Sequence, residues 1–197
     1  MRLELIERAA AMLASREPVT LRALVAGTGV STMAVYTHFD GMPGLWRAVR
    51  QEGFTRLAQR LDLVESTSDP VRDLVALGAA YVSNAVAHPT LYRTMFDAGF
   101  DLDDPEAADA SLLLLVHAAA RARRQGRFAP GADPAAVATQ LWAVGHGLTM
   151  LVLTGVLPDH ALVVHAPPMV TALFIAAGDD ENRCRRSVLT GWRLDAP

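Results

Sequence analysis

Apolar residues recur along the chain with the three- and four-residue spacing of α-helices, whereas the strict alternation typical of half-buried strands is scarce. One face of the first predicted helix consists of Ile6, Ala9, Ala10 and Leu13. The pair Glu17-Pro18 should end this helix, because a residue before proline is displaced from the helical region. A longer helix, predicted over about residues 43–63, carries a stripe of Leu45, Val49, Leu57 and Leu61. The pattern predicts an all-α protein.

Start and stop signals divide the rest of the chain into further helices. Three Asp-Pro pairs predict helix starts near residues 70, 105 and 134, with Asp as the N-cap and Pro in the first turn. The pair His88-Pro89 separates the first of these helices from another over about residues 90–99. We expect a turn over 127–133, the end of the last long helix at Gly178, and one short helix or a loose end in the polar tail 181–197. The total is about nine helices.

Residues 20–39 read TLRALVAGTGVSTMAVYTHF and predict two short helices joined by a tight turn. Thr20 is placed to cap the first of them, and Ser31 is placed to cap the second. Gly29 can adopt the positive φ that such a turn requires. From these residues alone, the segment is either a helix-turn-helix or an ordinary αα-hairpin.

Charge is distributed unevenly over the 197 residues. The formal net charge is −3, which argues against a generic polybasic nucleic-acid binder, and every one of the 18 cationic residues is arginine. Residues 1–60 contain eight arginines and five acidic residues, whereas the remainder contains ten arginines and sixteen acidic residues. This asymmetry predicts a small basic module on an acidic helical body. We place the module at 1–60, the body at 61–180 and the tail at 181–197.

Cysteine usage and the N-terminal composition exclude several classes of protein. Cys184 is the single cysteine, so it cannot form an intrachain disulfide, and the sequence has no zinc-type spacing of Cys and His. Glu4 and Glu7 interrupt the N-terminal apolar stretch, which is unlike a signal peptide. We expect a cytoplasmic protein without metal or other cofactor. A helical enzyme is the less favoured alternative, because the histidines lack carboxylates at general-base spacing.

Two uncharged segments, 134–158 and 161–178, raise the alternative of a membrane-associated helical hairpin. Against it, the first segment contains Gln140, His146 and three glycines, and Pro167-Pro168 should break the second. Arginines are not clustered at either flank to set an orientation. We therefore expect two helices that are buried in a core or against a second subunit, without membrane contact.

A family resemblance favours one of the two alternatives for residues 20–39. The strings Gly29-Val30-Ser31 and Val35-Tyr36-Thr37-His38-Phe39, followed by Leu45, resemble the DNA-binding domain of the TetR/AcrR family of transcriptional repressors over about residues 3–60. Further strings resemble the Trp-His-Gly type of ligand-sensing domain of that family: His88-Pro89, Leu91-Tyr92-Arg93, Met95-Phe96, Leu141-Trp142-Ala143 and His146-Gly147. The resemblance implies a three-helix helix-turn-helix domain over 1–60 and a ligand-sensing and dimerisation domain over 61–180.

The resemblance also implies which side chains meet DNA. The major groove would be faced by Thr32, Met33 and Thr37, and phosphates would be held by Thr20, Ser31, Tyr36 and His38. The family usually has a lysine where this chain has Met42, so backbone amides near Gly44 would serve the phosphate instead. Arg22 and Arg47 are the candidates to replace the lost charge.

For the sensing domain, the candidates for ligand contact are Tyr81, Tyr92, Met95, Phe96, Phe100, His117, Trp142 and His146. The alternative is that these residues are plain core. Arg121, Arg123 and Arg124 are either an anion site or, more in keeping with a helix C-terminus, a solvated face. The resemblance implies a homodimer through helices of about 134–157 and 161–177. The implied function is a repressor that binds double-stranded DNA at a palindrome-like operator and is released by a small, largely apolar effector.

Overall fold

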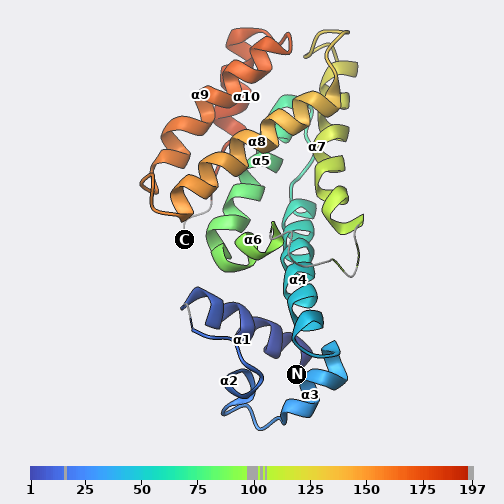
Figure 1. Cartoon of the computed structure of the whole chain (residues 1–197). Helices are drawn as coiled ribbons and strands as arrows, with labels where there is room; N and C mark the ends of the chain where they lie inside the picture. Colours follow the sequence, from blue (N-terminus) through green and yellow to red (C-terminus); the bar gives the residue numbers. More distant parts are fainter. Residues whose placement is uncertain (16, 97–101, 103, 105, 195–197) are drawn as a thin grey trace. The chain divides into compact units, whose positions relative to one another are not determined.

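The computed structural model describes residues 1–15, 17–96, 102, 104 and 106–194, and all regular structure in these residues is helical (Figure 1). The helices are α1 (Arg2–Ala14), α2 (Leu21–Val25), α3 (Thr32–Phe39), α4 (Met42–Asp62), α5 (Pro70–Ala87), α6 (Pro89–Met95), α7 (Glu106–Arg124), α8 (Pro134–Leu153), α9 (Ala161–Ala176) and α10 (Glu181–Gly191). The predicted all-α fold is confirmed. The described residues hold ten helices instead of about nine, because the polar tail contributes α10.

The helices belong to two compact units. The N-terminal unit comprises Met1–Arg56 and His88–Ala108, and the C-terminal unit comprises Leu57–Ala87 and Asp109–Pro197. Helix α4 is therefore divided between the two units. Helix α6 belongs to the N-terminal unit, although it lies within the region that the sequence assigns to the sensing domain.

An apolar cluster holds the N-terminal unit together. Its buried residues come from α1, α2, α3, α4 and α6: Leu5, Ile6, Ala9, Ala10, Met12, Leu24, Val35, Phe39, Leu45, Ala48, Val49 and Leu91. Leu13, which the sequence analysis placed in the buried stripe of α1, is 37% exposed. Leu5 and Met12 take its place, because positions three and four residues from Ala9 share its side of the helix.

Helices α2 and α3 form the predicted pair of short helices. Thr20 is the N-cap of α2, and its hydroxyl oxygen accepts a hydrogen bond from the Ala23 amide at 3.2 Å. Gly29 has a φ of 74° in the following turn, as predicted. The guanidinium of Arg8 in α1 donates to the carbonyl oxygens of Ala23 and Ala26 at 3.3 and 2.6 Å. These bonds tie the end of α2 to α1.

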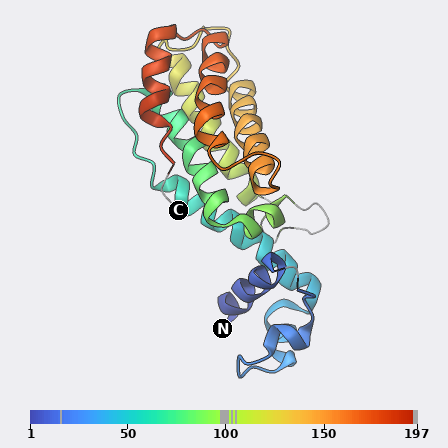
Figure 2. The same ribbon diagram turned by 90° about the vertical axis from the view of Figure 1, so that its left-hand side faces the viewer.

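In the C-terminal unit, α5, α8, α9 and α10 pack against one another: α5 contacts α8 and α10, and α9 contacts the same two helices (Figures 1 and 2). The predicted N-caps are present at the starts of α5 and α8. A carboxylate oxygen of Asp69 accepts from the amides of Val71 and Arg72, each at 3.1 Å. Asp133 accepts from the Ala135 amide at 3.0 Å. Local capping chemistry therefore sets where these two helices begin.

Helix α9 runs without interruption through Pro167 and Pro168, so the predicted break at this pair is wrong. The prolines lack the N–H groups that would bond to the carbonyl oxygens of Val163 and Val164. Both valines are exposed, at 60% and 54%, so these carbonyls lie on the accessible side of the helix. The opposite side keeps the helix in place through its buried residues Leu162, Ala166, Val170 and Phe174.

A buried ionic cluster links α5, the segment after α7, and α10. The guanidinium of Arg127 donates to both carboxylate oxygens of Asp179, at 2.8 and 2.7 Å, and to Asp69 at 2.5 Å. The Ser187 hydroxyl donates to the other oxygen of Asp69 at 2.6 Å. Burial opposes the charge on Arg127, but the hydrogen bonds and charges of Asp179 and Asp69 raise its pKa. The cluster fixes the tail helix to the body of the unit.

Cys184 lies beside this cluster and is fully buried. Its thiol lies 3.7 Å from the carbonyl oxygen of Thr171. Burial and the adjacent Asp179 raise the pKa of the thiol to about 12. A thiol in this environment is protonated and shielded, so it packs as a small apolar group.

Candidate DNA-binding and ligand-binding sites

The exposed face of α3 carries side chains predicted to read DNA. Val35 and Phe39 are buried beneath it, so Met33 and Tyr36 project outward and are 67% and 53% exposed. Thr37 is exposed as well, and its hydroxyl donates to the Met33 carbonyl oxygen at 3.0 Å. The face thus offers a thioether, a phenol and a methyl group to a partner.

The flanks of α3 hold the other predicted contacts. Ser31 is the N-cap by position, but its side chain makes no capping hydrogen bond, because the Ala34 amide bonds to the Ser31 carbonyl oxygen at 3.0 Å. Thr32 is half-buried, and Thr20 is exposed at the start of α2. His38 is exposed but lies on a different side of the helix from Met33, since five residues correspond to a rotation of about 140°.

The turn between α3 and α4 is closely packed. A Cβ atom on Gly44 would lie 1.5 Å from the carbonyl oxygen of Phe39, so glycine is required at this position. Met42, at the position where the resemblance places a lysine, packs against the apolar cluster of the N-terminal unit. The guanidinium of Arg47 lies 3.3 Å from where the Gly44 Cβ would be, and it therefore lies next to this turn.

Sequence reasoning missed Arg2 as a neighbour of α3. Its guanidinium carbon lies 5.4 Å from the centre of the Phe39 ring, within the range of a cation–π contact. No local signal announces this contact, because the two residues are distant in sequence. Arg2 and Arg47 together bring positive charge to the C-terminal end of α3, while Arg22 is exposed on α2.

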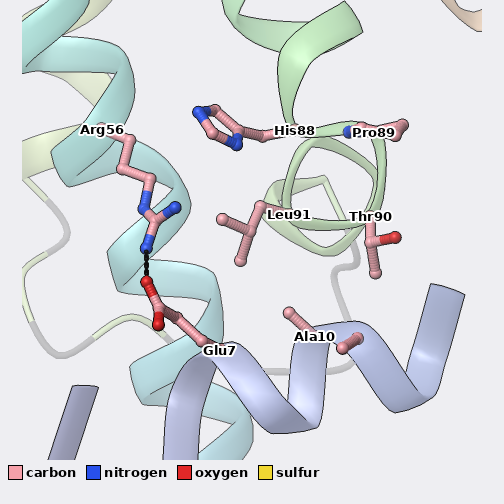
Figure 3. Close-up of a pocket in the computed structure, with 8 residues that line it drawn as sticks. Glu7, Ala10, Arg56, His88, Pro89, Thr90 and Leu91 are labelled. Atoms are coloured by element: carbon pink, nitrogen blue, oxygen red, sulfur yellow. Dashed lines mark hydrogen bonds and ion pairs between the residues drawn. The ribbon is translucent and has the colours of Figure 1, made fainter. Parts of the chain in front are cut away.

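A pocket of about 300 Å³ lies within the N-terminal unit (Figure 3). Its lining residues come from α1, α4 and the start of α6: Glu7, Ala10, Ala11, Arg56, His88, Pro89, Thr90 and Leu91. The Arg56 guanidinium donates to Glu7 and Glu52, each at 2.8 Å. Burial and the nearby Arg56 lower the pKa of His88. Because two carboxylates already hold Arg56, we interpret it as a link between α1 and α4 and not as an anion site.

In the C-terminal unit, three of the predicted ligand-contact residues come together. The indole N–H of Trp142 donates to the hydroxyl oxygen of Tyr81 at 3.0 Å. The same hydroxyl lies 3.1 Å from Nδ1 of His146. The rings of Trp142 and His146 have centroids 5.8 Å apart. Tyr81 is buried and the other two are half-buried, and burial lowers the pKa of His146. We call Tyr81, Trp142 and His146 the α5–α8 triad.

The remaining candidates for ligand contact lie elsewhere. Tyr92, Met95 and Phe96 belong to α6 and its end in the N-terminal unit, where Phe96 makes edge contacts with Tyr92 and Phe54 at ring distances of 5.2 and 6.3 Å. Tyr92 and Met95 are fully buried, as core residues are. His117 is exposed on α7. Phe100 lies outside the described residues.

Arg121 matches neither interpretation offered from the sequence, an anion site or a solvated face. Its guanidinium donates to the carboxylate of Asp73, to the Ser66 hydroxyl and to the Thr67 carbonyl oxygen. Burial alone would raise the pKa of Asp73, but hydrogen bonds from the Thr67 amide and hydroxyl and from Arg121 lower it. Arg121 thus joins α7 to the start of α5. Arg123 and Arg124 are exposed.

Within the described part of the chain, α8 is the one helix that is long and apolar enough to cross a membrane, judged by length and composition. Helix α9 has 16 residues, fewer than the roughly 20 that a spanning helix needs. A two-helix hairpin would require both. Helix α8 also buries Val137, Leu141, Leu148 and Val152 in the unit, as the core helix of a folded domain does.

Comparison with known proteins bears on both sites. A family model described as a tetracyclin repressor-like C-terminal domain matches residues 74–167, which include the α5–α8 triad. An uncharacterized HTH-type transcriptional regulator of Mycobacterium tuberculosis, Rv0681, is 27% identical over 143 residues, which are 73% of this chain and 65% of that protein. The chain belongs to the TetR family. The match spans slightly less than two thirds of the length of Rv0681.

Solved structures agree with the TetR assignment. A protein of unknown function from Rhodococcus sp. RHA1 is similar with a TM-score of 0.70 and 29% identity, covering 94% of this chain and 93% of that one. A regulatory protein of the TetR family from Rhodococcus RHA1 has a TM-score of 0.71 at 19% identity, covering 91% and 97%, and it supports the fold alone. The TetR assignment places the chain among transcriptional regulators and not among enzymes.

Proposed function

We propose that this TetR-family chain is a ligand-responsive transcriptional repressor that binds double-stranded DNA. The observation that carries the proposal is the exposed face of α3, where Met33, Tyr36 and Thr37 project outward from a helix whose other side is buried. A helix held in this way can enter the major groove. Arg2 and Arg47 add positive charge at its end, where a DNA phosphate would pass.

Base recognition by α3 would depend on apolar contacts and DNA shape. The helix contains no Arg, Asn or Gln for bidentate hydrogen bonds to purines. Met33 and the threonine methyl groups are suited to thymine methyl groups. Tyr36, Thr20, Ser31, His38 and the backbone near Gly44 would position the duplex through its phosphates. Sequence preference would therefore include positions that are read through groove width.

The proposed repressor is a homodimer through α8 and α9. Each helix has an exposed uncharged stripe: Ala136, Gln140, Ala143, Gly147 and Leu151 on α8, and Val164, Pro168, Ala172 and Ile175 on α9, with Gly147 half-buried. Small and apolar residues at this spacing permit close packing of helices across a two-fold axis. Two α3 helices about 34 Å apart would then meet a palindrome-like operator.

The effector of the repressor would bind at the α5–α8 triad. Two half-buried rings and a buried hydroxyl give an apolar surface with few polar groups, as is typical of small-molecule sites. A small, largely apolar molecule bound there would favour a conformation that does not fit the operator. The proposal places this regulation in the cytoplasm.

Fluorescence anisotropy tests the DNA-binding proposal. The full chain is titrated into labelled duplex from upstream of its own gene and into a scrambled duplex of the same composition, at several salt concentrations. We expect a preference for the upstream duplex and an affinity that falls steeply with salt. Equal affinity for the two duplexes would contradict the proposed function.

A further inference from the structure

We propose that the α5–α8 triad recognises an uncharged ligand through an acceptor oxygen, such as a ketone or ester carbonyl, to which Nε2–H of His146 donates a hydrogen bond. This inference rests on the proposed function, because it takes the triad as the effector site. It changes the largely apolar effector expected from the sequence into one that carries a specific polar atom.

The direction of the hydrogen bonds assigns the donor. An indole N–H can only donate, so the Tyr81 oxygen accepts the bond from Trp142 at 3.0 Å. The Tyr81 hydroxyl has one proton, and Nδ1 of His146 lies 3.1 Å away. When Tyr81 donates this proton to Nδ1, Nδ1 is the acceptor and the imidazole proton resides on Nε2. The triad thus ends in an N–H donor.

The charge state of His146 selects the kind of acceptor. Burial lowers the pKa of this imidazole, so the ring is neutral at physiological pH. A neutral N–H donor pairs with a carbonyl oxygen without burying a net charge. A carboxylate would need a cation to offset its desolvation, and the triad itself supplies none.

A second observation points to a ligand at the same face of α8. Thr149 is fully buried, and its hydroxyl has no hydrogen-bond partner among the described residues. Trp142, His146 and Thr149 occupy positions i, i+4 and i+7, which lie on one side of a helix. A buried hydroxyl without a partner costs about 1–3 kcal/mol, and such groups call for a partner outside the chain.

Other helical threonines of this chain do not share this property. Thr55 donates to the carbonyl oxygen of Gln51 at 3.0 Å, and Thr94 donates to that of Thr90 at 3.0 Å. The same back-bond from Thr149 would go to the carbonyl oxygen of Gly145. Its side chain does not make this bond, so the Thr149 hydroxyl remains as a second polar group on the triad side of α8.

The two glycines beside His146 give the site its space. A Cβ atom on Gly145 would reach Tyr81 at 3.9 Å and Val82 at 3.6 Å, so α5 and α8 are in contact there. A Cβ on Gly147 would have nothing within 4 Å. The imidazole therefore has a close neighbour on one side and open space on the other. Together with the Trp142 indole, this suits a flat apolar body that carries the acceptor oxygen.

The first test measures the imidazole tautomer of the ligand-free full chain. Nitrogen NMR of ¹⁵N-histidine-labelled protein distinguishes a proton on Nε2 from one on Nδ1, with assignment through a His146→Gln variant. We expect the Nε2–H tautomer in the wild type. In Tyr81→Phe, which removes the proton donor to Nδ1, we expect a mixture of tautomers. A wild-type ring protonated on Nδ1 would overturn the proposal.

The second test compares matched probes in the absence of DNA. Acetophenone and ethylbenzene share a skeleton and differ in the carbonyl oxygen, and their affinities are measured by isothermal titration calorimetry. We expect acetophenone to bind at least about fivefold more tightly, because one hydrogen bond is gained. In His146→Leu the ratio should fall to about one. Thr154→Val, an exposed threonine in the turn after α8, should leave the ratio unchanged.

Equal affinities in the wild type, or an unchanged ratio in His146→Leu, would overturn the proposal. Tyr81→Phe gives a second route if His146→Leu does not fold, as judged by far-UV circular dichroism, and it should reduce the ratio at least about twofold. Both tests are independent of operator binding. If the ketone preference holds and the upstream duplex is not preferred, the proposed function fails and the ligand chemistry stands. The reverse result rejects the ligand chemistry alone.

Discussion

Arg127 and Asp179 meet through two parallel hydrogen bonds of 2.8 and 2.7 Å, and their side chains are only 3% and 1% exposed. The pair joins the segment after α7 to the start of α10, which are 52 residues apart. A second carboxylate, that of Asp69, and the Ser187 hydroxyl complete the hydrogen bonds of the guanidinium. Such a pair costs free energy to desolvate, but removing one partner costs more than the pair itself.

Replacement of Asp179 by Asn should destabilise the protein by about 3–5 kcal/mol, because it leaves the buried Arg127 undercompensated. Urea unfolding followed by far-UV circular dichroism measures this change. The matched control is Glu181→Gln, which removes an exposed pair with Arg185 whose side chains are 60% and 61% exposed. We expect less than about 0.5 kcal/mol for the control. A cost for Asp179→Asn no larger than that of the control would contradict the structure.

Stability should fall with pH in two stages. The pKa values of His146 and His88 are lowered in the folded state, mainly by burial, so the unfolded chain binds more protons below pH 6.5 and stability declines there. Asp69 and Asp73 also have lowered pKa values, so the stability that they contribute is present above about pH 3.8 and is lost below it.

Urea unfolding at fixed protein concentration, over a series of pH values, checks both stages. A variant with His88→Asn and His146→Asn should lose most of the upper decline and keep the lower one. An unchanged upper decline in this variant would show that other groups cause it.

Replacement of Gly44 by Ala should disrupt the N-terminal unit, since the new Cβ would lie 1.5 Å from the backbone oxygen of Phe39. We expect a loss of at least about 3 kcal/mol in the stability of this unit, together with loss of DNA binding. Gly131→Ala is the control, because a Cβ there meets nothing within 4 Å. Thermal unfolding and anisotropy on the same samples distinguish the two variants. Normal DNA binding by Gly44→Ala would contradict the observed packing.

Single changes on α3 should separate phosphate contacts from base contacts. Tyr36→Phe removes a hydroxyl assigned to phosphate, so affinity for upstream and scrambled duplexes should fall alike, by about threefold to tenfold. Met33→Ala should weaken binding to the upstream duplex more than to the scrambled one, because it removes an apolar base contact. Anisotropy titrations of both variants measure the ratios. A selective effect of Tyr36→Phe would contradict its phosphate role.

A charge on the exposed stripe of α9 should prevent dimer formation. Val164 is 54% exposed in the single chain, and Val164→Arg would place a guanidinium in the proposed interface. We expect a monomer by light scattering, whereas the wild type should have the mass of a dimer. Leu189→Arg is the matched control, since Leu189 is 72% exposed on α10, away from that stripe. A dimeric Val164→Arg would require a different interface.

Sequence reasoning succeeded where the deciding interaction is local. The caps at Thr20, Asp69 and Asp133 depend on amides two or three residues away, and the turn at Gly29 depends on its own φ. It failed where tertiary contacts decide. The buried partners of Arg127 lie 52 to 60 residues away, and packing of the buried side of α9 overrides its internal prolines.

The candidate sites follow the same division. The exposed side of α3 could be predicted, because the spacing of Val35 and Phe39 fixes which side is buried. Of the eight predicted ligand contacts, the structure joins Tyr81, Trp142 and His146 through hydrogen bonds. The aromatic residues of α6 pack instead against α4, which the residue types alone do not reveal. Arg2 became visible only through its distance from Phe39.

The burial of Cys184 has a practical consequence for measuring how this regulator moves. With a pKa of about 12 and no exposure, the one native thiol should not react with maleimides or methanethiosulfonates while the protein is folded. A cysteine introduced at an exposed position of α3 would therefore be the sole labelled site in each subunit, without any prior change to the native sequence. Two spin labels in one dimer would then report the distance between the recognition helices directly, before and after a ligand is added.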